Sequence, residues 1–583
     1  MSTPTVGLVG AGPATDAVRA ALADAPAEPV DCDPERVGAA DFAVVVGEAG
    51  AERFAAANRS AREGETPWLA VELGGVGGRA VPDVAAAVSG FAPATACWAC
   101  LRTRVAANLN DAATSTDTAA SATDARFAGA LAGREAATLL SGGESTVLGG
   151  VVEVPHAERT LLPVPGCGGC GRDAEQELRA DRTLDREYRD ADLEDALTRA
   201  EQAVDERVGV VSSIGEAESF PTPYYLAQLA DTTGFSDAQA AEQAAGVSVD
   251  WNEALMKALG EAQERYAAGV YRTAAFETGR PSDVDGAIAP SAFVRPDDWA
   301  DPGDDPVAWV PGEDLQTGDP VGLPAEFVHF PPPEVRHKPS ITTGLGLGSS
   351  TVEALLSGLY EVVERDAAML AWYSSFEPLA LSVESEQFAA LRSRARAEDL
   401  DVTALLVTQD VDVPVVAVAV HREGAWPRFA VGSDADLDPE AAATSALAEA
   451  IQNWMELRSM GEDDAAEADG AIGRYADFPE SAREFVDAET AVPVGSVGPA
   501  DPPAGAAELD AVLDRLADAG LSAYAARLTP RDVEQLGFEA VRALVPAAQP
   551  LFTGEAFFGE RAREVPAELG FEFRPDRDHH PYP

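Results

Sequence analysis

The sequence predicts a Rossmann-like α/β domain at the N-terminus and a larger α+β domain after it. A chain of 583 residues exceeds what one hydrophobic core usually supports, so two or three domains are expected. In the first part, short apolar runs alternate with Ala-rich helical segments, which is typical of a parallel α/β sheet. In the second part, strand-like runs at 402–407 and 413–420 alternate with helical patterns at 439–460 and 506–519.

The first element is a buried strand at residues 5–10, and a glycine turn and a helix follow it. Further apolar runs lie at 42–46 and 68–73. The turn reads Gly10-Ala-Gly12-Pro-Ala-Thr15, so Thr15 replaces the third glycine of the dinucleotide-binding pattern. Asp31 and Asp33 end a second strand, where an acidic residue would meet a ribose. Because the glycine pattern is incomplete, we favour a structural strand–turn–helix over a nucleotide site.

Composition divides the chain into three parts. Residues 1–172 form the α/β domain, and residues 173–206, dense in Asp, Glu and Arg at helical spacing, form an acidic helical linker. Residues 207–583 form the second domain, which opens on the β-branched run 208–214. Within it, residues 280–340 are rich in Pro, Asp and Gly and predict loops and short strands.

The chain is strongly acidic, with 99 Asp and Glu against 42 Lys and Arg, a formal net charge of −57. Only two of the basic residues are lysines, Lys257 and Lys338. The acidic residues are spread along the whole chain, which indicates a cytoplasm with molar salt and therefore a halophilic source. Passive binding of nucleic acid is excluded on the same ground.

Targeting signals are missing from the sequence as well. No run of eighteen apolar residues occurs, so no membrane span is predicted. Residues 1–12 lack the basic segment of a signal peptide. We therefore expect a cytoplasmic protein.

Four of the five cysteines form two Cys-x-x-Cys pairs, Cys97 with Cys100 and Cys167 with Cys170. Each pair can supply two corners of a tetrahedron, so together they predict a structural Zn²⁺ site. A redox pair or four buried thiols are the alternatives. Cys32 is left over and is expected in the core.

The pentapeptide Glu-x-x-Glu-Arg occurs twice, at 261–265 and at 361–365, each time inside an apolar helical pattern. At about 100° per residue its three charged side chains share one helix face. Paired carboxylates hold Mg²⁺, and Mg²⁺ and arginine neutralise phosphate, so two such helices predict a magnesium–polyphosphate site. The alternative is a pair of solvated helix faces, since acidic residues are common here.

Two further segments belong with these helices. The second helix is preceded by a glycine-rich stretch, 342–348, with Ser350 and Thr351 as N-caps, which is a favourable entry for an anion. Glu353 follows on the same helix. The helix at 439–460 carries Glu449 and Gln452 at a spacing of three and could complete the pocket.

The chain ends in His579-His580-Pro581-Tyr582-Pro583. Such a tail is usually disordered, and a solvated histidine pair is the default expectation. The two prolines stiffen the tail, however, and its terminal carboxylate is a free base.

Together these motifs resemble the YcaO family, from about residue 205 to the end. The matching segments are 246–250, 258–266, 344–366, 446–452, 528–533 and 545–551, and the proline-rich end resembles that of azoline-forming members. The N-terminal part resembles the ThiF-like partner domain of such enzymes. The residues that carry this second likeness are the segments 96–101 and 165–171 with Arg104 and His156.

The resemblance implies an ATP-dependent cyclodehydratase that makes thiazoline or oxazoline rings in a ribosomally made peptide of the bacteriocin kind. A Cys, Ser or Thr side chain attacks the preceding amide, and ATP phosphorylates the amide oxygen, which leaves as phosphate. The implied ATP and Mg²⁺ ligands are Glu261, Glu264, Ser349, Glu353, Glu361, Glu364, Glu449 and Gln452. Arg265 and Arg365 are the implied phosphate-orienting groups, and the carboxylate of Pro583 is the implied base.

The sequence departs from the family pattern at several positions. Lys257 stands where Ser is usual and Ser349 where Asn is common. Trp454 and Glu456 occupy places where Arg is often found, and Arg458 could substitute for it. Thioamide or amidine formation, or a non-catalytic adaptor with a degenerate site, are therefore the alternative functions.

The resemblance also implies partners. These are a peptide substrate and a separate leader-peptide-binding protein, because the chain opens directly on its first strand, or an azoline dehydrogenase. A homodimer is a further option, and no nucleic acid or membrane partner is expected.

Overall fold

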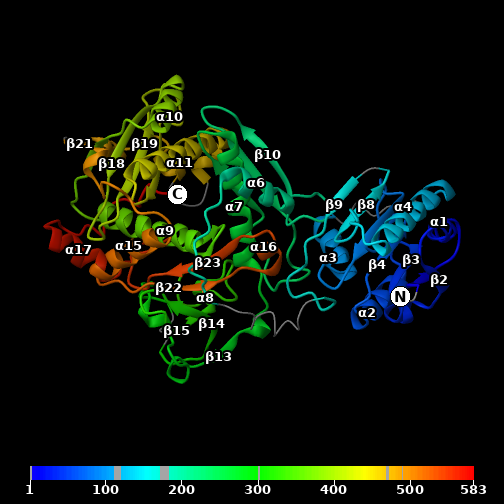
Figure 1. Cartoon of the computed structure of the whole chain (residues 1–583). Coiled ribbons are helices and arrows are strands. Elements are labelled where there is room, and N and C mark those ends of the chain that lie inside the picture. Colours follow the sequence, from blue (N-terminus) through cyan, green and yellow to red (C-terminus); the bar gives the residue numbers. More distant parts are fainter. Residues whose placement is uncertain are drawn as a thin grey trace.

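The computed structural model describes residues 3–109, 120–155, 157–170, 183–299, 303–467, 472–488 and 490–583. The chain forms two lobes, a smaller N-terminal one and a larger one built from the rest of the chain (Figure 1). His156 and the start of the expected linker lie outside the described residues. Among those described, no helix is both long enough and apolar enough to cross a membrane.

A seven-stranded sheet forms the N-terminal lobe. Its strands are β1 (Thr5–Val9), β2 (Glu28–Asp31), β3 (Phe42–Glu48), β4 (Trp68–Leu73), β7 (Ala86–Phe91), β8 (Gly150–Val154) and β9 (Ala157–Thr160). They lie in the order β2-β1-β3-β4-β7-β8-β9. The first four run parallel, and β7, β8 and β9 pair antiparallel. The parallel half is the α/β arrangement that the alternating strands and helices predict.

Glycines bring the elements of this lobe into backbone contact. The helices are α1 (Pro13–Leu22), α2 (Glu52–Glu63), α3 (Trp98–Asn108) and α4 (Ala122–Leu140). A Cβ at Gly129 of α4 would lie 2.2 Å from the carbonyl oxygen of Ala14, so α4 packs directly on α1. Gly10 has a φ of +114°, and a Cβ there would lie 2.6 Å from the carbonyl oxygen of Val46. This glycine of the first turn therefore serves the packing of β1 on β3.

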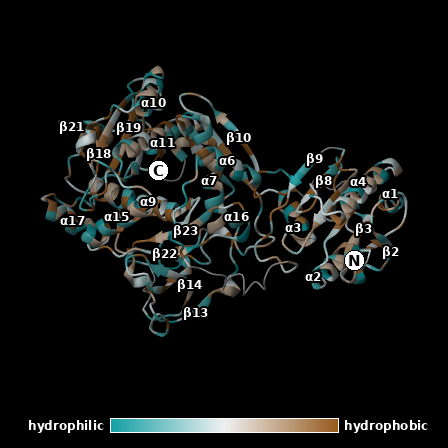
Figure 2. Cartoon of the chain, in the orientation of Figure 1, coloured by the Kyte–Doolittle hydropathy of each residue, from teal (hydrophilic) through white to brown (hydrophobic). Residues whose placement is uncertain are grey.

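The larger lobe contains three further sheets. One has the order β10-β11-β12, the second β13-β14-β22-β23-β16 with β15 paired to β14, and the third β20-β19-β18-β17-β21. The strands are β10 (Val211–Glu218), β11 (Tyr224–Leu229), β12 (Gln243–Val247), β13 (Glu277–Gly279), β14 (Val307–Asp314), β15 (Pro320–Pro324), β16 (Leu345–Gly348), β17 (Leu379–Ser382), β18 (Asp401–Leu406), β19 (Val415–His421), β20 (Phe429–Ala435), β21 (Ala491–Pro493), β22 (Tyr524–Arg527) and β23 (Glu539–Leu544). Apolar strands such as β19 lie inside the lobe (Figure 2).

Three long helices cover these sheets, α7 (Trp251–Gly269), α9 (Thr351–Trp372) and α11 (Pro439–Met460). Shorter helices are α6 (Leu193–Ala200), α8 (Ala325–Val328), α10 (Glu386–Ala397), α15 (Ala506–Asp518), α16 (Arg531–Gln535) and α17 (Arg561–Leu569). The prediction of short strands within 280–340 is confirmed by β14 and β15. The strand expected at 208–214 begins three residues later than predicted, because the N–H groups of Val208 and Gly209 bond to Asp205 in a turn.

Each long helix begins at a side-chain cap. Asp250 accepts the N–H of Asn252 at 2.8 Å, and Asp438 accepts that of Glu440 at 2.9 Å. Ser350 accepts the N–H of Glu353 at 3.3 Å, as the sequence predicts for this position. The caps fix the helix starts and therefore the rotation of the carboxylates along each helix.

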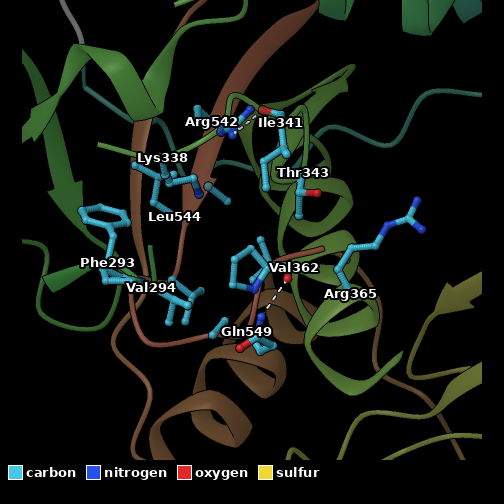
Figure 3. A pocket seen from close by; sticks show the side chains of 15 residues that line it. Phe293, Val294, Lys338, Ile341, Thr343, Val362, Arg365, Arg542, Leu544 and Gln549 are labelled. Carbon is cyan, nitrogen blue, oxygen red and sulfur yellow. Dashed lines mark hydrogen bonds between the residues drawn. The ribbon is translucent and has the colours of Figure 1, made fainter. Parts of the chain in front are cut away.

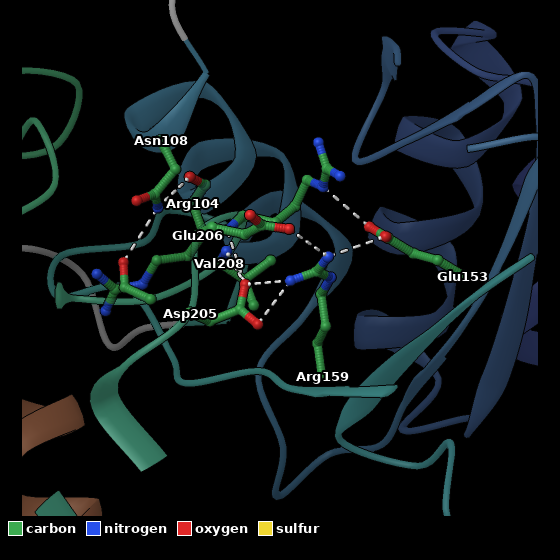
Figure 4. Close-up of polar contacts among 9 residues, drawn as sticks. Arg104, Asn108, Glu153, Arg159, Asp205, Glu206 and Val208 are labelled. Carbon is green, nitrogen blue, oxygen red and sulfur yellow. Dashed lines mark hydrogen bonds and ion pairs between the residues drawn. The ribbon is translucent and has the colours of Figure 1, made fainter. Parts of the chain in front are cut away.

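Ion pairs join the two lobes beside β8 and β9 (Figure 4). Arg159 donates to both oxygens of Asp205, at 2.8 and 2.7 Å. Asp205 also accepts the N–H groups of Arg207 and Val208. Glu153 on β8 accepts from Arg159 and Arg207, both at 3.1 Å. The chain that leaves the N-terminal lobe is thus held against it by charge-assisted hydrogen bonds.

A second contact between the lobes is completely buried. Arg104 of α3 donates to Asp532 of α16, and the hydroxyl of Tyr266 on α7 donates to the same carboxylate at 2.6 Å. Arg104 also donates to the carbonyl oxygen of Pro163 at 3.2 Å. The side chains of Arg104 and Asp532 have no exposed surface. Removing either partner therefore leaves an uncompensated charge in the interior.

We expect the Asp532→Asn variant to be less stable by about 3–5 kcal/mol, because Arg104 then lacks its counter-ion. Urea denaturation at fixed salt, followed by tryptophan fluorescence, measures the change. The control is Arg19→Met, which removes the exposed pair with Asp31 and should leave the midpoint unchanged. Equal midpoints for Asp532→Asn and the parent chain would contradict a structural role for this contact.

Candidate functional site

The three long helices of the larger lobe surround one cavity of about 730 Å³. The cavity is lined by residues of α7, α9 and α11 and of β12, β16 and β20, the strands on which these helices pack. The side chains that line it include all the residues expected from the helical motifs: Glu261, Glu264, Arg265, Ser349, Glu353, Glu361, Glu364, Arg365, Glu449 and Gln452. The structure thus brings together residues that lie up to 191 positions apart in the chain.

Each of the three helices packs against a strand glycine. A Cβ at Gly246 of β12 would lie 2.2 Å from the nitrogen of Ala258 on α7. A Cβ at Gly346 of β16 would lie 2.1 Å from the oxygen of Ala354 on α9. A Cβ at Gly432 of β20 would likewise lie 2.5 Å from a backbone oxygen of α11. No other residue type permits these backbone approaches.

Beside each glycine, one carboxylate of the helix accepts a backbone N–H from the strand side. Glu261 accepts from Ala245 at 2.9 Å, and Glu361 accepts from Gly344 at 3.0 Å. Glu449 accepts from Ser433 at 2.7 Å. Glu353 makes the same kind of bond to Ser349 at 2.8 Å. One oxygen of each carboxylate is therefore fixed. The second oxygen of Glu261 accepts from Arg265, and that of Glu449 lies 4.0 Å from Arg365, whereas the second oxygens of Glu353 and Glu361 have no such partner among the described residues.

The two arginines of the motifs lie among these carboxylates. Arg265 pairs with Glu261 at 3.2 Å and with Glu264 at 3.6 Å. Arg365 pairs with Glu364 at 3.4 Å and with Glu449 at 4.0 Å. Nε of Arg265 and Nη1 of Arg365 are both buried and form no hydrogen bond. These two nitrogens face Glu264 and Glu364 without forming a hydrogen bond, so they can donate to an anion that takes the place of the carboxylate.

The carboxylates raise one another's pKa. Burial, together with the nearby Glu361 and Glu261, raises the pKa of Glu264 to about 8. Burial also raises the pKa of Glu364 well above its usual value, against the effect of Arg365. Such a group of acids holds protons when empty and exchanges them for cations. The site is chemically suited to divalent metal ions and to the phosphates that they bind.

Two acidic residues of the cavity were missed by sequence reasoning. Asp434 and Asp436 line it from the end of β20. Burial raises the pKa of Asp434 to about 7 and that of Asp436 to about 6. The available signal was a pair of acids at strand spacing directly after the apolar run of β20.

The residues that depart from the family pattern differ in whether they lie in the cavity. Lys257 lines the cavity, and its charge offsets part of the rise that burial causes in the pKa of Asp434 and of Glu449. The hydroxyl of Ser349 accepts a hydrogen bond from Arg199 at 2.9 Å. Arg458 does not line the cavity. It pairs with Glu218 instead.

The expectation that Arg458 substitutes for the missing arginine of the third motif is therefore corrected. Besides Glu218, its guanidinium pairs with Glu398 at 3.5 Å. It lies 4.6 Å from the centre of the Trp454 ring. Gln452, in contrast, lines the cavity and donates to Glu456 at 2.9 Å.

The C-terminal tail is packed into the larger lobe. The N–H of His580 donates to the Tyr373 hydroxyl at 3.2 Å, and the indole of Trp372 donates to the carbonyl of Asp578 at 2.7 Å. Tyr582 is 1% exposed, and its pKa is raised by burial and by Glu364. The tail thus ends near the cavity side of α9. Pro583 is exposed and is not among the residues that line the cavity.

The default expectation of a solvated histidine pair is wrong for His580. Its side chain is buried, and its Nε2 lies 2.6 Å from the carbonyl oxygen of Phe552. Burial and the neighbouring His579 lower its pKa to about 3. His580 is therefore neutral at physiological pH, and its role is to hold the tail in place.

The four cysteines of the N-terminal lobe come together as the spacing predicts. Their sulfur atoms lie within 4.8 Å of one another. The sulfurs of Cys97 and Cys167 are 3.8 Å apart, and those of Cys100 and Cys170 are 3.3 Å apart. A tetrahedron of thiolates at about 2.3 Å from Zn²⁺ has edges of about 3.8 Å. The donor set and its spacing fit a zinc ion.

The cavity and the fold define a class of protein in which acidic helices from three sheets surround one site. Residues 245–549 match the family model described as YcaO cyclodehydratase, ATP- and Mg²⁺-binding. This stretch is more than half of the chain, and the chain belongs to the YcaO family.

Curated relatives match part of the chain. An uncharacterized protein of Methanothermobacter thermautotrophicus is 31% identical over 225 residues, which are 36% of this chain and 56% of the relative. A protein from the tfuA 3′ region of Rhizobium leguminosarum is 27% identical over 180 residues, or 28% of this chain and 42% of the relative. The chain spans about half the length of the curated relatives it matches.

Solved structures match nearly the whole chain. A heterocyclase in complex with substrate and cofactor has a TM-score of 0.75 at 20% identity, over 97% of this chain and 83% of the other. The heterocyclase TruD has a TM-score of 0.65 at 19% identity, over 98% of this chain and 82% of the other. At these identities the likeness shows a shared fold that extends over both lobes.

We expect the purified protein to contain one tightly held Zn²⁺ per chain, measured by plasma mass spectrometry after exhaustive dialysis. Cys167→Ser should lose the metal, because three thiolates hold it less tightly than four. Cys32→Ser, which alters the cysteine outside the cluster, should retain it. Metal-free parent protein would refute the four-thiolate site.

Stability should fall as the pH rises from about 6 to 8 in the absence of Mg²⁺. The folded protein keeps Glu264 protonated up to a pKa of about 8, whereas the unfolded chain releases that proton near 4.5. The folded state therefore binds more protons in this range and loses stability as the pH rises. Glu264→Gln should show a smaller loss in thermal melts at matched salt. The exposed Glu386→Gln serves as the control, and an unchanged slope in Glu264→Gln would contradict the argument.

Proposed function

We propose that this protein is an ATP-dependent cyclodehydratase that converts Cys, Ser or Thr residues of a peptide into azoline rings. The observation that carries the proposal is the convergence of eight expected ATP and Mg²⁺ ligands around one cavity of about 730 Å³. Membership of the YcaO family, whose description is an ATP- and Mg²⁺-binding cyclodehydratase, supports it.

The carboxylates of α7, α9 and α11 would hold Mg²⁺ through the oxygens that the backbone N–H groups leave free. Bound Mg²⁺ would neutralise the phosphates of ATP and polarise the transferred phosphoryl group. Arg265 and Arg365 would orient the phosphates with their unpartnered donors. Lys257 adds a positive charge near Asp434, where the family usually has a neutral serine.

The reaction balances as follows. The substrate side chain adds through its sulfur or oxygen to the preceding amide carbon, and the proton of the thiol or hydroxyl passes to a base. The amide oxygen takes the γ-phosphoryl group of ATP, which leaves ADP. The carbon–oxygen bond then breaks, phosphate departs, and loss of the amide proton forms the carbon–nitrogen double bond of the ring. The products are azoline, ADP and phosphate.

The terminal carboxylate of Pro583 is our candidate for the base. The packing of Asp578, His580 and Tyr582 against α9 supports this role, because it fixes the end of the chain near Arg365. A carboxylate on a held, proline-stiffened tail needs no reorganisation to accept a proton.

The N-terminal lobe would be a ThiF-like domain, spanning residues 1–172, that presents the peptide and contains structural Zn²⁺. Its cysteine cluster and the buried hydrogen bond from Arg104 to the Tyr266 hydroxyl of α7, at 3.3 Å, support this assignment. Residues 207–583 would then be the catalytic domain. The uniform negative charge supports a cytoplasm with molar salt as the working environment.

We expect Mg²⁺-dependent binding of the analogue AMP-PNP in molar KCl, measured by calorimetry. Glu361→Gln should weaken Mg²⁺-dependent binding of AMP-PNP by about 10- to 100-fold, because the metal site loses a charge. Glu386→Gln, an exposed acid on α10, is the matched control. Unchanged nucleotide affinity in Glu361→Gln would sink the proposed metal site.

The same preparation distinguishes the products. Incubation with ATP and synthetic Gly-Cys peptides should remove the mass of one water molecule per ring. Adding one glycine after Pro583 should abolish this loss while AMP-PNP still binds. Exchange of oxygen for sulfur in the presence of sulfide would identify thioamide formation instead. If neither the parent chain nor the extended chain binds nucleotide, a non-catalytic adaptor is favoured.

A further inference from the structure

A second, smaller cavity lies beside α9, where Val362 and Arg365 line it (Figure 3). Its volume is about 40 Å³. Among the described residues, Arg365 alone lines both cavities. In Figure 3 its guanidinium points away from the other labelled residues, so the stem of Arg365 forms a wall of the small cavity.

The small cavity is lined by positive and neutral groups. Lys338 comes from the segment before β16 and Arg542 from β23, and both line it together with Thr343. No Asp or Glu is among its described lining residues. This is the reverse of the large cavity, whose carboxylates outnumber its cations.

The ammonium of Lys338 has little to balance it. It lies 5.5 Å from the centre of the Phe327 ring, and no described residue accepts a hydrogen bond from it. The nearest carboxylate that acts on it is Glu326. The oxygens of Glu326 already accept the N–H groups of Arg336 and His337 and a bond to the His337 ring, each at 2.6 Å. Glu326 is therefore engaged elsewhere.

Arg542 is a second cation of the cavity and is itself buried. It is 3% exposed, and its terminal nitrogens donate to the carbonyl oxygens of Ile341 and Thr342 at 2.9 Å. Its Nε is buried without a partner. Burial and Arg542 together lower the pKa of Lys338 to about 7. Glu361 and Glu264 of the large cavity act on Arg542, but burial still lowers its pKa to about 10. Neither cation forms an ion pair with a described residue, so an anion between them would stabilise both.

The volume limits what that anion can be. A water molecule needs about 10–15 Å³ of such space, so the cavity has room for about three to four. This excludes a nucleotide and matches a tetrahedral oxyanion. Thr343 also lines the cavity, and rotation of its side chain would turn the hydroxyl toward an anion there.

We propose that the cavity lined by Lys338, Arg542 and Thr343 is a binding site for a small oxyanion, inorganic phosphate. Its role as the place that receives phosphate released from ATP rests on the proposed function. The stem of Arg365 is the wall between the two sites, and movement of this side chain would connect them.

The test uses the full-length protein in EDTA at fixed salt, with inorganic phosphate as the probe in calorimetry. Without Mg²⁺ the acidic cavity repels phosphate, so binding reports the small cavity alone. Lys338→Met should weaken phosphate binding at least tenfold. The matched control is Arg19→Met, which removes an exposed cation of the N-terminal lobe and should leave phosphate affinity unchanged.

Further measurements test the site with a second variant, with another anion and at different pH. If Lys338→Met does not fold, Thr343→Val, which preserves shape, should still weaken binding. Acetate in place of phosphate shows whether a carboxylate is preferred, which would overturn the assignment to phosphate. Sulfate affinity should fall as the pH rises through 7, because Lys338 loses its charge, and Lys338→Met should abolish this dependence.

The outcome is separable from that of the proposed function. AMP-PNP binding in Mg²⁺ without phosphate binding in EDTA would refute the phosphate site and leave the ATP site intact. Phosphate binding that persists in Lys338→Met and Thr343→Val would also refute it. Phosphate binding without nucleotide binding would support the site and refute the cyclodehydratase.

Discussion

The site depends on one repeated contact between a helix and a strand. In α7, α9 and α11 a strand glycine lets the helix approach, and a helix carboxylate accepts a backbone N–H beside that glycine. The contact sets both the distance of the helix from its sheet and the direction of the carboxylate. Because three sheets each supply one such contact, three carboxylates converge on a shared space. A side chain larger than hydrogen at any of these glycines would move a whole helix and not only one ligand.

This arrangement has an electrostatic cost that the protein reduces in several ways. Buried carboxylates that face one another are unfavourable when ionised, so their pKa values rise and some remain protonated. Arg265 and Arg365 offset part of the repulsion, and backbone N–H groups stabilise single oxygens. Bound cations would therefore stabilise the site, because they would reduce the repulsion that remains between the carboxylates. The neighbouring cavity is lined by cations and by no carboxylate among the described residues, and Arg365 lines both cavities.

Much of the site could be predicted from the sequence, because its motifs are local. The periodicity of α7 and α9 places two Glu-x-x-Glu-Arg groups on single faces, and short spacings define the cysteine pairs. Contacts between distant segments could not be predicted in this way. The pairing of Arg104 with Asp532 joins residues 428 positions apart. Lys338, in the loop before β16, lies close enough to Arg542 on β23 for the two charges to interact. The burial of His580 depends likewise on tertiary packing.

The position of Asp532 has a consequence for how the protein can be divided. Its neighbour Arg531 donates to the sulfur of Cys170 at 3.5 Å, so two adjacent residues of the larger lobe contact the core of the smaller one. Tyr266, which shares the carboxylate of Asp532, directly follows Arg265 on α7. If the two lobes were produced as separate polypeptides, each would expose a charge that the other normally covers. Such halves would be obligate partners, soluble and correctly shaped only when they are co-expressed.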